Sequence, residues 1–109
     1  MPPHRLSLEP LSLLDVGARE TVDIAARTGF DYVSMVLHEP APMRPPDPIV
    51  TDTGLRRETA AAMKAAGIGL LNIECFNLTP EATPEAFAAG LACGHELGAR
   101  TATAILMEN

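Results

Sequence analysis

The sequence is poor in positive charge, and this shortage excludes some classes of partner. Lys and Arg together number 8 against 14 Asp and Glu, so the formal net charge is −6. The adjacent basic pair Arg56 and Arg57 we interpret as a solvated helix face. Because nucleic acids and anionic membranes are bound through neutralising cations, we expect neither as a partner.

Cysteines and long apolar runs are also scarce. The two cysteines, Cys75 and Cys93, fit no metal-ligand spacing, and we expect both to be reduced structural thiols of a cytoplasmic protein. The opening MPPHRLSLEP has no long apolar core, so we do not expect it to act as a signal peptide. No stretch approaches the roughly 18 apolar residues of a membrane-spanning helix.

The residues that are present suit an ordinary globular domain. Hydrophobic residues make up 47% and charged residues 20% of the 109 positions. A chain of this length can bury a modest core, so we expect a single domain over residues 1–109.

Three segments of the chain repeat one pattern. They are ARETVDIAARTGFDYVSMVL (18–37), LRRETAAAMKAAGIGLLNIECF (55–76) and EAFAAGLACGHELGARTATAILM (85–107). Each is an Ala-rich helical run, then a glycine, then a run typical of a β-strand. The glycines are Gly29, Gly67 and Gly98, and glycine is favoured just past a helix end because it adopts the left-handed conformation cheaply. Just before the third segment, Thr83 and Pro84 are typical of a helix N-cap and first helical residue.

Residues 4–9 (HRLSLE) resemble an opening strand, so the predicted order is β-α-β-α-β-α-β. Helices between successive strands imply a parallel α/β sheet with right-handed crossovers. A doubly wound sheet would fit this order, but the Gly-rich phosphate loop usual after its first strand is missing here. A repeat of roughly 31 residues matches a (β/α)8 barrel. We therefore predict the first four strands and three helices of such a barrel, a half TIM barrel.

Alternation along the predicted strands gives each one an apolar and a mixed face. In the third strand Leu71, Ile73 and Cys75 share one face, and Asn72, Glu74 and Phe76 share the other. The mixed faces of the first three strands end in Glu9, His38 and Glu74 respectively. In a barrel the mixed faces point inward and the carboxyl ends of the strands form the active-site mouth, so we expect these three groups to converge there.

Simpler interpretations stay open for these residues. In an open sheet the mixed faces would meet water, and Glu9 could belong to a loop before Pro10. Asn77 and Glu108 also fall near predicted strand ends and are further candidates. His95 lies in the middle of a predicted helix and is expected on the surface.

Three stretches of the chain, DIAARTGFDYVSM, DTGLRRET and AAGIGLLNIE, resemble the xylose isomerase-like TIM-barrel family of sugar phosphate isomerases and epimerases. The resemblance covers nearly the whole chain and is carried by the scaffold. It implies proton transfer on a sugar through an enediolate, assisted by a divalent cation (Mn²⁺, Mg²⁺ or Co²⁺). It also implies a small-molecule sugar as substrate.

The resemblance implies roles for five residues. Glu74 and His38 would be catalytic, and Glu9, Asn77 and Glu108 would bind substrate. In relatives the main metal ligands lie on later strands, so no metal ligand is assigned here, no bound cation is expected for this chain alone, and the chain alone is expected to be inactive.

Two functions without catalysis remain as alternatives. A half barrel could bind a partner or a second copy of itself, since two copies would supply eight strands and seal the open sheet edges. A small α/β binding domain is the other alternative.

Overall fold

The computed structural model describes residues 5–10, 15–38 and 47–107, apart from the side chain of Cys75. The elements alternate as predicted: β1 (Ser7–Leu8), α1 (Ala18–Thr28), β2 (Tyr32–Val36), α2 (Thr53–Ala66), β3 (Gly69–Leu78), α3 (Pro84–Glu96) and β4 (Thr101–Leu106). The opening strand falls inside the predicted range 4–9 but is only 2 residues long.

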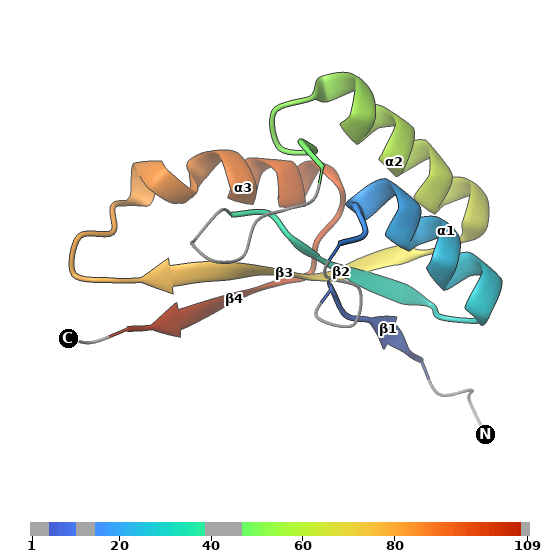
Figure 1. Ribbon diagram of the computed structural model, residues 1–109, viewed down its shortest axis with the longest axis horizontal. Coiled ribbons are helices and arrows are strands. Elements are labelled where there is room, and N and C mark those ends of the chain that lie inside the picture. The colour runs from blue at the N-terminus through green and yellow to red at the C-terminus, as the bar shows by residue number, and fades with distance from the viewer. Residues whose placement is uncertain (1–4, 11–14, 39–46, 108–109) are drawn as a thin grey trace.

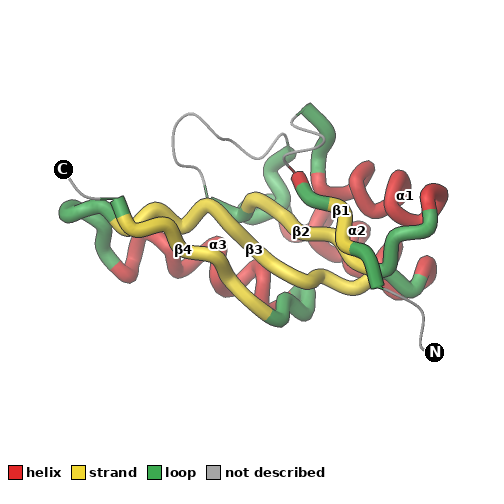
Figure 2. The backbone as a smooth tube through the Cα atoms, turned by 90° about the horizontal axis from the view of Figure 1, so that it is seen from below, coloured by secondary structure: helices red, strands yellow, loops and turns green. Residues whose placement is uncertain are grey.

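All four strands are parallel and lie in the order β1-β2-β3-β4, so each strand pairs with the next one along the chain. The predicted parallel α/β sheet is therefore confirmed. Figures 1 and 2 show α1, α2 and α3 on one face of the sheet, while no described helix covers the other face. A doubly wound sheet carries helices on both faces, which is not the arrangement of the described elements.

The helix ends follow from local sequence. Gly29, Gly67 and Gly98 have φ of 87°, 70° and 86°, the left-handed conformation that the repeat predicts for them. Thr83 is the N-cap of α3 and Pro84 begins the helix, also as predicted. These positions fix where each helix stops and the chain turns back toward the sheet.

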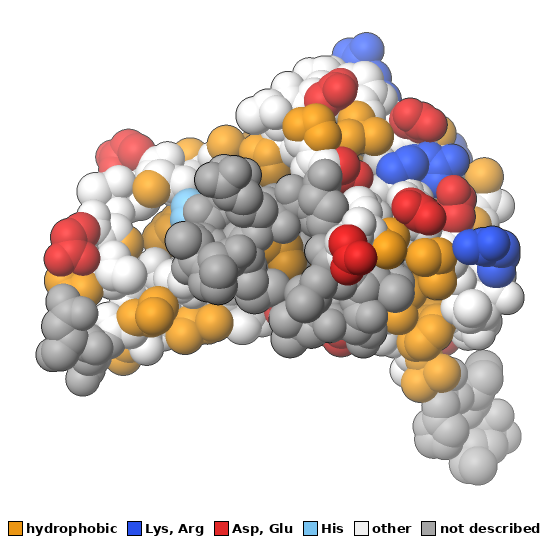
Figure 3. Space-filling model, viewed as in Figure 1, with side chains coloured by type: hydrophobic (Ala, Val, Ile, Leu, Met, Phe, Trp, Pro, Cys, Tyr) orange, Lys and Arg blue, Asp and Glu red, His pale blue; other side chains and the backbone are white. Residues whose placement is uncertain are grey.

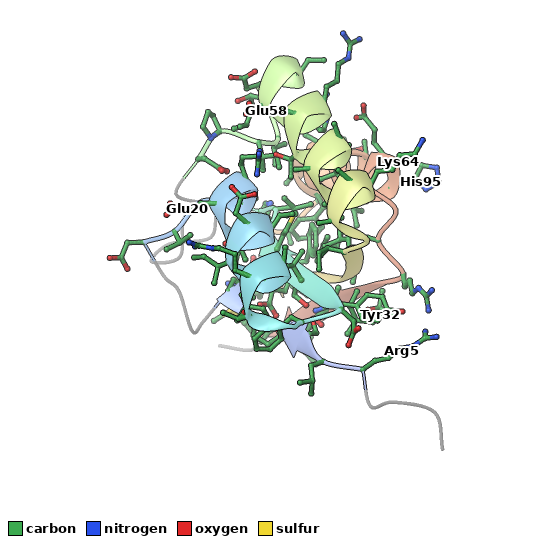
Figure 4. All side chains as sticks on the ribbon, turned by 90° about the vertical axis from the view of Figure 1, so that its right-hand side faces the viewer. Arg5, Glu20, Tyr32, Glu58, Lys64 and His95 are labelled. Atoms are coloured by element: carbon green, nitrogen blue, oxygen red, sulfur yellow. The ribbon has the colours of Figure 1, made fainter. Side chains whose placement is uncertain are left out.

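The hydrophobic core lies between the helices and the sheet. Its buried members from the strands are Leu8, Val33, Met35, Leu70, Ile73 and Phe76, and those from the helices include Val22, Ala25, Met63 and Cys93. Cys93 is a free, buried thiol, as expected. The same prediction for Cys75 lies outside the described side chains. The exposed side chain of His95 projects outward from α3, also as expected (Figure 4).

Two irregularities in β3 change which side chains share a face. Ile73 pairs with Ala102 and Phe76 with Ala104, so two residues of β3 stand opposite the single residue Thr103 of β4. A second register shift lies between β2 and β3. Such bulges break the strict alternation of a strand.

The bulge corrects the predicted position of Phe76. A Cβ added at Gly90 of α3 would come within 3.3 Å of the Phe76 ring, and a Cβ added at Gly94 would contact Ile73. Phe76 and Ile73 therefore both face the helices. The prediction that Phe76 shares a face with Asn72 and Glu74 is wrong, because strict alternation does not hold across the bulge.

Arg56 is also not the solvated residue that was predicted. Its guanidinium donates to the carbonyl oxygens of Ile49 and Val50 at 3.2 and 2.9 Å and to Glu96 at 2.6 Å. Its side chain is only 15% exposed. Arg56 thus ties the segment before α2 to both α2 and α3, because its side chain, which belongs to α2, is bonded to acceptors in that segment and in α3.

The edge strand β4 differs from the rest of the sheet, because every one of its residues is exposed. Ile105, Leu106 and the following Met107 are 48%, 72% and 46% exposed. In Figure 3, Lys and Arg side chains gather over α1 and α2, whereas the region over β4 shows hydrophobic and uncharged atoms. β4 thus offers an uncharged, apolar edge.

Tyr32 is the first residue of β2 and lies at the amino-terminal end of the sheet. Its hydroxyl accepts a hydrogen bond from Arg5 at 3.0 Å, and Figure 4 shows the two side chains meeting beside β1. The guanidinium of Arg100 lies 5.4 Å from the ring centroid.

Among the described helices, none is long and apolar enough to cross a membrane.

Candidate functional site

Two carboxylates, one just after β1 and the other in β3, lie near one another on the face without helices. Glu9 directly follows β1, and Glu74 lies in β3, where it pairs with Val36 of β2. Ser34 stands between them on β2, paired with Asn72. Since Val33 and Met35 face the helices, Ser34 points to the opposite face. The parallel ladder therefore gathers polar groups from three strands toward the carboxyl end of the sheet.

Hydrogen bonds join the first two strands at this site. The Ser34 hydroxyl donates to Oε1 of Glu9 at 3.1 Å. Its oxygen lies 3.4 Å from the Ser7 hydroxyl. Ser34 is only 1% exposed, whereas Glu9 is exposed. The buried hydroxyl of Ser34 therefore holds one end of an otherwise exposed carboxylate.

Glu74 has the more unusual environment of the two carboxylates. Its Oε1 atom is buried and has no hydrogen-bond partner among the described residues. Burial raises the pKa of the Glu74 carboxyl above its ordinary value, and the negative charge of Glu9 raises it further. A carboxyl with a raised pKa can take up and release a proton closer to neutral pH, which is the property of a general acid or base.

A neutral polar group lies beside this pair, between β3 and β4. The Asn72 amide donates to the Thr103 hydroxyl at 2.9 Å, and its oxygen accepts from the Thr101 hydroxyl at 2.9 Å. The spacing of Thr101 and Thr103 in the last strand was the available signal for this group, since alternate residues share a face. Its side chains can hydrogen-bond a polar ligand, but they carry no charge.

His38 is placed differently from the two glutamates. Strand β2 ends at Val36, so the alternation of the strand does not extend to His38. Its ring stacks on Phe76 with centroids 5.7 Å apart and meets the edge of Phe87 of α3 at 4.8 Å. No hydrogen bond joins the imidazole to Glu9 or Glu74 in the described part of the chain. The structure therefore brings Glu9 and Glu74 together but gives His38 an aromatic environment.

The two remaining candidates are only partly described. Asn77 is half-buried in β3 and pairs with Ile105, so it follows the bulge near the end of the strand. Glu108 lies outside the described residues. Of the three residues expected to bind substrate, the structure thus describes Glu9 and Asn77.

The described residues do not form a metal site. No group of three or more His, Cys, Asp or Glu side chains comes together within residues 5–10, 15–38 and 47–107. Glu9 and Glu74 are the two carboxylates that lie near one another in this part of the chain.

No known protein family matches the sequence, and no curated protein is significantly similar to it. The structure is similar to the crystal structure of an uncharacterized protein from Parabacteroides distasonis ATCC 8503, with a TM-score of 0.69 and 17% identity over 94% of this chain. The chain spans 43% of the length of that protein. At this identity the similarity shows a shared fold.

Proposed function

We propose that the four strands and three helices form half of a (β/α)8-type barrel like those of the xylose isomerase-like family. Three observations support this. The strands follow one another in sequence order, and the helices lie on one face, as in a barrel wall. The same fold occurs within a protein of which this chain spans 43%.

Within this barrel half we propose a sugar isomerase- or epimerase-like activity in which Glu74 transfers the proton. The buried, unpartnered Oε1 of Glu74 beside the charge of Glu9 is the observation that carries this proposal. Glu74 in its ionised form would take the proton from the carbon next to the sugar carbonyl, giving an enediolate. The same carboxyl would return that proton to the neighbouring carbon on the same face, while the proton of the adjacent hydroxyl passes to the former carbonyl oxygen. Epimerisation would instead need a second group to protonate the first carbon from the other face.

The neighbouring groups would bind and orient the sugar. The Glu9 carboxylate accepts hydrogen bonds and suits a sugar hydroxyl, while Asn72, Asn77 and Thr103 offer neutral donors and acceptors. We propose His38 as a second catalytic group, held at the end of β2 by its contacts with the aromatic rings. No step of this proposal uses a cation, and full turnover would require residues beyond those described.

A sugar-binding experiment tests the proposal. Amide resonances of the ¹⁵N-labelled chain would be followed during titration with a panel of free and phosphorylated aldoses and ketoses. We expect shifts at Glu9, Ser34 and Glu74 that are lost in Glu74→Gln and retained in Glu81→Gln, a control on an exposed loop. The absence of these shifts for every sugar would contradict the proposal. Turnover by the chain alone would refute the need for further residues.

The exposed edge favours a second candidate function, self-association through β4. The strand TATAIL has no charged residue, and its Ile105 and Leu106 are exposed. It contains none of the lysines and prolines that protect many edge strands from pairing with another chain. Pairing of two copies would give eight strands. Sedimentation at increasing concentration should show a dimer that Leu106→Lys abolishes and the surface variant Arg57→Lys preserves. A monomer at all concentrations would exclude this function.

A further inference from the structure

We propose that a pocket at the amino-terminal end of the sheet binds a small aromatic carboxylate. This pocket lies at the opposite end of the sheet from Glu9 and Glu74, so the inference does not depend on the proposed function. It rests on the size of the pocket, on its apolar floor, and on the aromatic ring and the cations around its opening.

The pocket has a volume of about 310 Å³ and is lined by the carboxyl-terminal parts of α2 and α3. The sheet contributes Tyr32 and Gly69, with which β2 and β3 begin, and Arg100, which directly precedes β4. Small-molecule sites in proteins range from about 300 to 1,000 Å³. A pocket at the lower limit of this range fits one ring, or two fused rings, with a short acidic arm.

The floor of the pocket is apolar and buried. Its side chains are at most 8% exposed and belong to Met63, Ile68, Leu70 and Leu97. A methionine thioether makes favourable contacts with aromatic rings. The hydroxyl groups of a sugar would lose water here without gaining a hydrogen-bond partner from these four side chains. The floor therefore favours an aromatic ring over a strongly polar ligand.

The aromatic ring of Tyr32 is held in place beside this floor. Gly69 has no side chain, and a Cβ added there would lie 2.9 Å from the Tyr32 ring, so the ring rests close to the backbone of β3. The Tyr32 hydroxyl also accepts a hydrogen bond from Arg5 at 3.0 Å. Because these contacts order the ring before a ligand arrives, binding costs less conformational entropy.

Two exposed cations, Lys64 and Arg100, line the same pocket. Figure 4 shows Lys64 and Tyr32 on the same side of the molecule, and the Arg100 guanidinium lies 5.4 Å from the centroid of the Tyr32 ring. Neither cation forms an ion pair with a described residue. Glu96, the acidic residue of the lining, is paired with Arg56 at 2.6 Å. The charge around the pocket is therefore positive and favours an anion, although the chain as a whole carries −6.

The ends of the two helices leave this preference intact. The carboxyl end of a helix carries partial negative charge on its last carbonyl groups. Backbone N–H groups of residues 67, 68, 97 and 98 donate to the carbonyl oxygens of Met63, Lys64, Cys93 and His95. Since these carbonyls are already bonded, the side-chain cations are the charged groups left to contact the ligand.

Titration with benzoate and 2-naphthoate tests the proposal. Amide resonances of the ¹⁵N-labelled chain should show saturable shifts at Gly69, Leu70, Gly98 and Arg100, with a Kd for benzoate on the order of 1 mM. Cyclohexanecarboxylate keeps the charge but not the aromatic ring, and benzyl alcohol keeps the ring but not the charge. Each should bind about threefold more weakly than benzoate, or weaker still. No saturable shift with either aromatic acid, or equal affinity for either matched compound, would overturn the proposal.

Variants then locate the binding site. The double variant Lys64→Gln, Arg100→Gln should bind benzoate about tenfold more weakly, because it loses two exposed ion pairs. Arg57→Gln removes an exposed cation outside the pocket and should leave the affinity unchanged. Tyr32→Leu should abolish the preference for benzoate over cyclohexanecarboxylate. Unchanged benzoate affinity in the double variant would overturn the proposal, and this comparison decides the outcome if Tyr32→Leu does not fold.

Discussion

The central strand β2 and the edge strand β4 belong to the same parallel sheet but have opposite environments. Val33, Ser34 and Met35 of β2 are at most 2% exposed, whereas Leu106 of β4 is 72% exposed. The difference comes from their neighbours: helices pack over β2 and strands flank it on both sides, whereas β4 pairs only with β3 among the described strands.

This contrast shows that a strand-like sequence does not by itself report burial. The difference in burial can be measured through the free energy of unfolding, because a side chain contributes to stability roughly in proportion to the apolar area that it removes from water. The predictions below test the difference between the covered and the uncovered parts of the sheet.

The largest effect is expected for truncation of a core side chain on β2. Met35 is 2% exposed, and Met35→Ala should lower the free energy of unfolding by about 2–5 kcal/mol through lost burial and a new cavity. Ile105→Ala on β4 should cost less than about 1 kcal/mol, because Ile105 is 48% exposed. Urea denaturation at equal protein concentration measures both. Equal losses would show that β4 is buried in solution by a partner.

The next largest effect concerns the close approach of α3 to the sheet. A Cβ at Gly90 would collide with the Leu37 carbonyl, so Gly90→Ala should destabilise the fold by about 1–3 kcal/mol although Ala is the better helix former. In the matched control Gly54→Ala, the new Cβ would lie 3.4 Å from Asp52, and stability should be unchanged or rise by up to about 1 kcal/mol. A Gly90→Ala variant as stable as the wild type in thermal denaturation would mean that α3 is free to shift.

A smaller effect is expected where Arg56 ties the covering segments together. Arg56→Lys should lower the free energy of unfolding by about 1–2 kcal/mol, because one ammonium cannot reach both carbonyls and Glu96 in the same geometry. Its exposed neighbour provides the control, and Arg57→Lys should change stability by less than about 0.5 kcal/mol. Similar denaturation midpoints for the two variants would contradict the role of Arg56 in tying these segments together.

The smallest expected effect is a pH dependence of stability that arises from Glu74 on the face without helices. Because the pKa of Glu74 is raised above its ordinary value of 4.5 in the folded protein, the folded state binds more protons than the unfolded state above that pH. Glu74 should therefore lower stability as pH rises above about 4.5, and Glu74→Gln should be the more stable protein near neutral pH. Below that range the difference should stay constant with pH.

Unfolding curves of the wild type and Glu74→Gln between pH 4 and 7 would measure this effect, with Glu81→Gln as an exposed control. A difference that does not grow with pH would show that Glu74 is ordinarily solvated.

Much of the fold follows from residues that act locally. Gly29, Gly67 and Gly98 mark the helix ends, and Thr83 with Pro84 marks the start of α3, because backbone conformation there depends on one or two residues. The proximity of Glu9 and Glu74 could also be predicted, since the carboxyl ends of parallel strands lie at one edge of the sheet.

The errors share a different cause. Phe76 was assigned to the wrong face because the bulge depends on how β3 pairs with its neighbours. The aromatic surroundings of His38 were missed because Phe76 and Phe87 lie far from it along the sequence. Arg56 resembled a surface cation, since its carbonyl acceptors come from a segment that only the folded chain brings near.

The sequence alone determined the order of the elements, the glycines past the three helix ends, the start of α3 and the apolar face of β2, because these depend on backbone preferences and side-chain periodicity within a few residues. The tertiary structure decided the burial of Ser34, the exposure of β4 and the raised pKa of Glu74. Each of these three properties depends on which residues, distant along the chain, pack beside the group, and whether water is excluded there.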